Sequence, residues 1–65
     1  MSYTLYEVWA EEETGHQELI ETTASLTEAT KLAEQAVIDG YFAGVIYKET
    51  DDGDLEEVQR YEAEE

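Results

Sequence analysis

A single helix-like segment between two regions of alternating sequence most constrains how this chain can fold. Ser25 is followed three residues later by Glu28, a pairing in which each side chain can satisfy a free backbone amide at a helix start. Asp39-Gly40 ends the segment, since glycine accepts the left-handed backbone of a helix C-terminal cap. Between these ends, apolar residues recur at the 3.6-residue spacing of one helix face: Ala29, Leu32, Ala33, Ala36 and Val37. The sequence therefore predicts one helix near the middle of the chain.

Two pairs of strand-like segments surround the predicted helix. Aromatic, β-branched and acidic residues alternate over 4–11 and 18–23, and the turn residues 13–16 join these segments into a hairpin. A second pair, 42–49 and 55–61, flanks the tight turn 51–54. No linker, internal repeat or low-complexity segment is evident. We expect an α+β fold of ββαββ order, a four-stranded antiparallel sheet with one helix packed on one face.

The length of the chain, 65 residues, allows one domain with a small core. Its apolar content of 42% is too high for a disordered acidic tail, so we expect one folded domain over 1–65 with a frayed tail at 62–65. The absence of Cys excludes disulfides. With no apolar run of membrane-spanning length and no signal-peptide pattern at the start, we expect a cytoplasmic protein of a bacterial host cell.

Alternation along the strands assigns residues to the two faces of the expected sheet. Because one helix covers only one face, the other face must be open to solvent or to a partner, and its mixture of aromatics and carboxylates is typical of a recognition face. A bulge or a one-residue slip would exchange parts of the two sets. The face expected against the helix carries Tyr6, Val8, Ala10, Ile20, Ile46 and Val58. The face expected to be open carries Tyr3, Leu5, Glu7, Trp9, Glu11, Leu19, Glu21, Val45, Tyr47, Glu49, Glu57 and Tyr61.

The formal net charge of −15 is the strongest functional signal, with 18 Asp and Glu against Lys31, Lys48 and Arg60. Unpaired like charges destabilise a small domain, so we expect them to serve binding rather than folding. They also exclude direct contact with nucleic acid or an anionic membrane, because phosphate would be repelled. A compact chain of this length is expected to have a diameter of about 28 Å. Duplex DNA of that length carries roughly 16 charges, which is close to the net charge of the chain.

No catalytic or metal-binding constellation stands out, and we expect neither enzyme activity nor a cofactor. Ser2 and Ser25 lie in no nucleophile motif that could work with His16, the only histidine. His16 alone provides too few ligands for zinc, and 51–54 lacks the ligand spacing of a calcium loop. The candidate site residues are instead partner-binding side chains: Glu7, Trp9, Glu11, Glu12, Glu13, Glu21, Tyr47, Glu49, Asp51, Asp52, Asp54, Glu56, Glu57 and Tyr61.

The acidic residues gather in blocks at 11–13, 51–54, 56–57 and 62–65, which indicates a directed electrostatic field. Carboxylates two residues apart on a strand lie about 6.6 Å apart, on the order of the spacing of successive phosphates along DNA. Such rows suit a basic groove that normally holds nucleic acid. Trp9, Tyr47 and Tyr61 would then supply the desolvated anchors that turn attraction into tight binding.

The sequence resembles the small acidic DNA-mimic inhibitors of phages and mobile elements. It shares with them the acidic blocks, the scarcity of Lys and Arg and the short ββαββ chain. Within that group it is most similar to compact anti-CRISPR proteins that imitate duplex DNA carrying a protospacer-adjacent motif (PAM). The resemblance implies a non-enzymatic anti-defence inhibitor that binds a nucleic-acid-binding subunit of a type I CRISPR-Cas surveillance complex. Because an exposed Trp-Tyr patch is rarely left unoccupied, we expect a monomer or a weak homodimer. Two alternatives remain open: a barstar-like inhibitor of a basic nuclease toxin, and a halophile housekeeping domain whose charge serves solubility.

Overall fold

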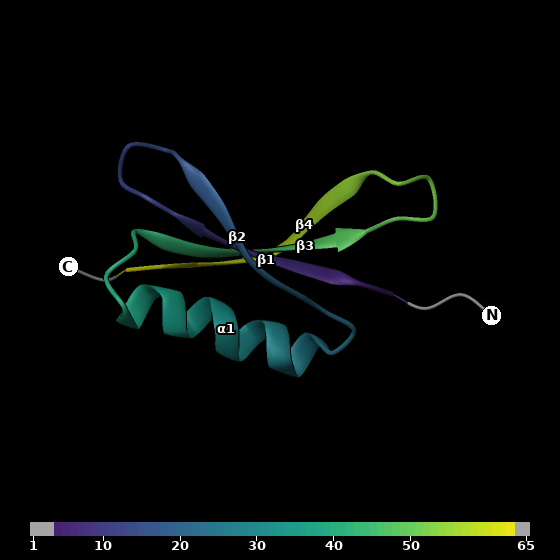
Figure 1. Cartoon of the computed structure of the whole chain (residues 1–65), viewed down its shortest axis with the longest axis horizontal. Helices are drawn as coiled ribbons and strands as arrows, with labels where there is room; N and C mark the ends of the chain where they lie inside the picture. Colours follow the sequence, from purple (N-terminus) through teal and green to yellow (C-terminus); the bar gives the residue numbers. More distant parts are fainter. Residues whose placement is uncertain (1–3, 64–65) are drawn as a thin grey trace.

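The computed structural model describes residues 4–63 and has the predicted ββαββ order. The elements are β1 (Tyr6–Glu11), β2 (Gln17–Thr23), α1 (Leu26–Ile38), β3 (Ala43–Glu49) and β4 (Leu55–Glu62). The strands form one antiparallel sheet in the order β2-β1-β3-β4, and α1 lies across one face of it (Figure 1). The predicted fold class is therefore confirmed, and pairing of β1 with β3 supplies the strand order that the sequence left open.

The predicted tail boundary is wrong at its first residue. Glu62 is the last residue of β4, where it pairs with Ala43 of β3, so the sheet continues one residue past the expected end of this strand. Tyr3 and residues 64–65, to which the sequence analysis also assigned roles, lie outside the described residues.

The start of α1 forms half of the predicted reciprocal cap. The Oγ of Ser25 accepts a hydrogen bond from the Glu28 N–H at 3.2 Å, as expected for a residue at the helix N-terminus. The Ser25 N–H donates to the Oγ1 of Thr23 at 3.2 Å, so a residue of β2 takes the role predicted for the Glu28 carboxylate. The cap therefore joins β2 and α1 directly.

The end of α1 is a Schellman cap. The N–H groups of Gly40 and Tyr41 donate to the carbonyls of Val37 and Ala36, each at 3.1 Å. Gly40 has a φ of +110°, which confirms the predicted role of this glycine. With 13 residues, α1 is too short to cross a membrane, and residues 4–63 contain no other helix.

The core lies between α1 and the two central strands. Val8 and Ile46, which pair across β1 and β3, are fully buried against Ala29 and Ala33 of the helix. A Cβ added to Gly44 of β3 would lie 2.2 Å from the carbonyl oxygen of Ala33. The helix therefore packs directly on the backbone of β3, and small residues on both elements permit this close approach.

A β-bulge in each edge strand changes the predicted faces of the sheet. The register shifts between Val8 and Trp9 on one side and between Ile46 and Tyr47 on the other, which leaves Ile20 of β2 and Val58 of β4 without a cross-strand partner. Both side chains are 42% exposed. The predicted place of Ile20 and Val58 in the core is therefore wrong.

The same bulges move two predicted partner-binding residues to the helix side of the sheet. Glu21 lies opposite Val8, and residues directly opposite each other share a face. Tyr61 lies opposite Gly44 and packs against the buried core cluster. The predicted placement of Glu21 and Tyr61 on the open face is wrong, because one inserted residue reverses every later side chain of its strand.

The two hairpins repeat one another, which corrects the expectation of no internal repeat. Each turn is closed by backbone hydrogen bonds of 2.8–2.9 Å and contains a glycine of positive φ, Gly15 at +95° and Gly53 at +86°. The bulge residue follows five positions after that glycine in both cases, at Ile20 and Val58. The hairpins are thus related by an approximate two-fold axis, and α1 breaks this symmetry.

Candidate partner-binding surface

The centre of the open sheet face is covered by its own side chains. Trp9 and Tyr47 meet edge to face, with ring centroids 6.5 Å apart and planes at 88°. The Trp9 Nε1 donates to the Oε1 of Glu7 at 3.1 Å. Val45, between Trp9 and Arg60 in the register, is fully buried although α1 lies on the other face. The two predicted aromatic anchors therefore lie together, half-buried in a small second core.

A hydrogen-bond chain crosses this face beside the aromatic pair. The hydroxyl of Tyr47 donates to the Oε1 of Gln17 at 3.3 Å, and the Nε2 of Gln17 donates to the Oε1 of Glu11 at 2.9 Å. The guanidinium of Arg60 donates to the other oxygen of Glu11. Glu7 and Glu11 therefore hold the face together instead of offering free carboxylates, and they form no phosphate-like row.

Arg60 is the positive centre of this network, with Glu57 and Glu62 each 3.8 Å away in addition to Glu11. Hydrogen bonds from Gln17 and then from Arg60 lower the pKa of the Glu11 carboxyl, because they favour its ionised form. The hydrogen bond to Glu11 in turn raises the pKa of Arg60. Neither Gln17 nor Arg60 was predicted from the sequence for this face.

Replacing Glu11 with Gln is expected to cost about 1 kcal/mol at neutral pH, discounted because the Arg60 side chain is 31% exposed. A carboxyl whose pKa is lowered by folding stabilises the protein above its unfolded pKa, about 4.3, and loses this contribution as the pH falls through its folded value. Urea unfolding should therefore show a constant difference in unfolding free energy between the unchanged chain and Glu11→Gln from pH 7 to about 5.5. This difference should shrink below about pH 4. Glu57→Gln is the control, and a difference independent of pH would contradict the assignment.

The carboxylates without a basic neighbour lie mostly outside this network. None of the 16 acidic residues within 4–63 is buried. Within that range, a Lys, Arg or His nitrogen lies within 4.0 Å of four of them only: Glu11, Glu18, Glu57 and Glu62. Apart from Glu7, which accepts a hydrogen bond from Trp9, and Glu21 on the helix side of β2, the unpaired acids of the predicted site fall into two groups, one at each hairpin turn. Figure 1 shows these turns at opposite ends of the long axis of the molecule.

The larger group is in the β3–β4 hairpin and is called here the acidic hairpin: Glu49, Asp51, Asp52, Asp54 and Glu56. All five side chains are exposed. Glu56 lies opposite Lys48 in the register, but no basic nitrogen of the described chain lies within 4.0 Å of any of the five carboxylates. The turn is held by hydrogen bonds between Thr50 and Asp54, from the Thr50 N–H at 2.8 Å and from its Oγ1 at 3.2 Å to the Asp54 carbonyl. The acids are thus presented on a defined backbone.

Glu12 and Glu13 form the second group, in the β1–β2 turn. Since β3 connects the two ends of the sheet with seven residues, about 20 Å of strand separates this group from the acidic hairpin. Except for Glu21 and Tyr61 on the helix side, the predicted site residues therefore form two separate acidic ends with an internally bonded face between them. The molecule measures 42 × 21 × 15 Å, longer than the sphere expected from its size.

This elongated shape changes the comparison with DNA. A duplex 42 Å long carries about 25 charges, well above the net charge of −15 of the whole chain. The predicted match in total charge thus does not hold along the molecule. Any likeness to polynucleotide is local, and it is strongest where unpaired carboxylates are densest, in the acidic hairpin.

One group of metal-ligating side chains comes together in the β1–β2 hairpin. Ligand atoms of Glu12, His16 and Glu18 all lie within 4.8 Å of one another, and the three residues are exposed. Glu12 and Glu18 were not predicted from the sequence as neighbours of His16. Three exposed side chains would leave much of the coordination of a cation to water, and we assign no metal site to them.

No protein-family model, curated protein or solved structure matches this chain.

Proposed function

We propose that this domain is a non-enzymatic inhibitor that places its acidic hairpin in the basic DNA-binding site of a partner protein and thereby excludes DNA. The observation that carries the proposal is the run of five exposed carboxylates from Glu49 to Glu56, none paired with a basic group of the described chain. Repulsion within such a cluster opposes folding, so its presence supports a role in binding.

The backbone of the acidic hairpin suits this role. Hydrogen bonds of 2.8 and 2.9 Å close the turn between Thr50, Gly53 and Asp54, so little conformational entropy is lost when a partner binds. Asp51, Asp52 and Asp54 lie within four consecutive residues of the turn, so their negative charges are closely spaced, as are those of successive phosphates. Lysine and arginine side chains can therefore pair with them by charge-assisted hydrogen bonds, after association accelerated by the opposite charges.

The target we propose is the PAM-recognition site of a CRISPR-Cas surveillance complex or a similar defence complex, because that is the target implied by the resemblance to DNA-mimic inhibitors. A site that reads duplex DNA must carry basic side chains for the phosphates, and these are the groups that the acidic hairpin can bind.

The test is competition between the domain and a fluorescent PAM-bearing duplex for a purified, guide-loaded type I surveillance complex. We expect one domain per complex to release the duplex, less effectively as salt rises. A complex that holds duplex and domain together, with undiminished DNA binding, would contradict the proposal. Neutralisation of a small basic nuclease, with the surveillance complex unaffected, would replace the proposed target by the barstar-like alternative.

A further inference from the structure

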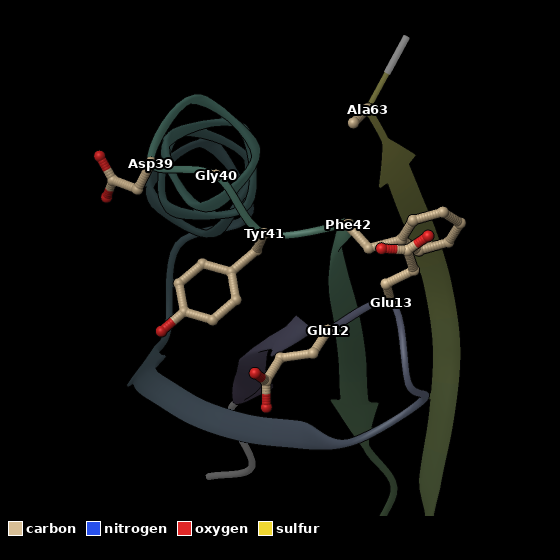
Figure 2. A pocket seen from close by; sticks show the side chains of 7 residues that line it. All are labelled: Glu12, Glu13, Asp39, Gly40, Tyr41, Phe42 and Ala63. Carbon is tan, nitrogen blue, oxygen red and sulfur yellow. The ribbon is translucent and has the colours of Figure 1, made fainter. Parts of the chain in front are cut away.

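A hollow of about 540 Å³ opens at the end of the molecule opposite the acidic hairpin. It lies where the β1–β2 turn, the cap of α1 and the neighbouring ends of β3 and β4 meet. Its lining consists of Glu12, Glu13, Asp39, Gly40, Tyr41, Phe42 and Ala63 (Figure 2). Glu12 and Glu13 were predicted as partner-binding residues, but the hollow itself was not predicted, because Tyr41 was assigned to no element and Phe42 only to the start of a strand.

Two aromatic rings flank the hollow, and their backbones are fixed. Tyr41 is held by the helix cap, where its N–H donates to the Ala36 carbonyl at 3.1 Å. Phe42 is held by the Ala63 N–H, which donates to its carbonyl at 2.9 Å. Figure 2 shows the two rings on different sides of the hollow with the Glu12 side chain below them. Phe42 is 39% exposed, so it offers apolar surface without being part of the core.

The electrostatic surroundings of the hollow favour a cation. Glu12 and Glu13 have no basic group within 4.0 Å in the described chain. The Asp39 carboxylate accepts a hydrogen bond from Gln35 at 2.9 Å and points away from the other two acids in Figure 2. The C-terminal end of α1 adds partial negative charge, and its last turn contains no basic residue to offset it. Aromatic faces attract cations in addition.

We propose that this hollow binds the guanidinium group of an arginine side chain supplied by the basic partner. Arginine is preferred to lysine because its planar, weakly hydrated group stacks on aromatic rings while it pairs with carboxylates. The inference rests on the proposed function, since a nucleic-acid-binding site is rich in such side chains. The domain then contacts its partner at two ends, through the acidic hairpin and through an arginine in the hollow.

The test is an NMR titration of the ¹⁵N-labelled full chain with Nα-acetyl-arginine amide at constant ionic strength. Nα-acetyl-citrulline amide, a neutral molecule of nearly the same shape, is the control ligand. We expect saturable shifts centred on Gly40, Tyr41 and Phe42, with arginine binding about fivefold more tightly than citrulline. Equal binding of the two ligands, or arginine shifts spread evenly over the acidic surface, would overturn the proposal.

Matched variants separate the hollow from general acidity. Glu13→Gln and Phe42→Leu should each weaken arginine binding about threefold. Glu34→Gln makes the same charge change on an exposed position of α1 and should leave binding unchanged. Equal weakening by Glu13→Gln and Glu34→Gln would show that the hollow has no specific role.

The inference and the proposed function can fail independently. If arginine binds the hollow but the domain never displaces DNA from a partner, the proposed function fails and the cation site remains. If the Phe42→Leu variant displaces DNA as well as the unchanged domain does, the hollow takes no part in partner binding. The ligand proposed for it is then wrong.

Discussion

Replacing Gly44 with Ala is expected to remove about 3 kcal/mol of folding stability, a large part of what a 65-residue domain possesses. The new Cβ would lie 2.2 Å from the oxygen of Ala33 and 2.8 Å from its carbonyl carbon and Cα. All three are backbone atoms, so no side-chain rotation can relieve the clash. The helix must move away from β3, which exposes Val8 and Ile46 of the core.

Thermal unfolding followed by circular dichroism measures this effect, and the midpoint should fall by about 15 °C. Gly40→Ala is the matched control, because no atom lies within 4 Å of the added Cβ and only the φ of +110° opposes the change. That variant should lose about 1 kcal/mol. If Gly44→Ala were no less stable than Gly40→Ala, the close packing of α1 on β3 would be refuted.

The second large effect is expected for partner binding when the acidic hairpin is neutralised. The triple variant Asp51→Asn, Asp54→Asn, Glu56→Gln should bind its partner about 100-fold more weakly, because three charge-assisted contacts are lost together. The same variant should unfold at a higher temperature than the natural sequence, since three repelling charges are removed. Weaker binding together with higher stability would show that these acids serve binding and do not stabilise the fold.

A second triple, Glu21→Gln, Glu28→Gln, Glu34→Gln, changes the net charge equally at exposed positions of β2 and α1. It should slow association slightly and leave dissociation unchanged, because long-range attraction depends on total charge while bound contacts depend on position. Isothermal titration and stopped-flow mixing separate these effects. Equal weakening by the two triples would show that total charge alone determines binding.

The predicted elements agree with the structure where their determinants are local in sequence. Ser25 and Gly40 bound α1 through contacts with residues three or four positions away, and such contacts can be inferred from the sequence. The face assignment failed at Ile20 and Val58, because a bulge is defined by the partner strand, and the alternation within one strand does not reveal it.

The internal repeat was missed because few residues are identical in the two hairpins. Glu11 and Glu49, Gly15 and Gly53, and Glu18 and Glu56 occupy equivalent positions, whereas the other equivalent positions mostly differ. In both hairpins the glycine is followed three residues later by a glutamate, and this equal spacing was a signal of the repeat that the sequence did contain. Chemical similarity of Ile20 to Val58 and of Trp9 to Tyr47 becomes meaningful once both bulges are known.

The candidate surface was predictable in its charge and less so in its geometry. Exposure of the acidic hairpin follows from its composition, since clustered carboxylates are not buried in a small domain. The network of Gln17, Glu11 and Arg60 was not predictable, because Arg60 lies 49 positions after Glu11 in the sequence and meets it across two strand pairings. That network takes Glu11 out of the surface available to a partner.

We propose that the acidic hairpin takes the place of DNA phosphates on a basic partner. The most direct measurement is release of a labelled PAM-bearing duplex from its purified surveillance complex by the natural domain and by the two triple variants. We expect displacement by the natural domain and by the Glu21, Glu28, Glu34 variant, with about 100-fold more of the acidic-hairpin variant needed. Displacement by the acidic-hairpin variant at the same concentration as the natural domain would contradict the claim.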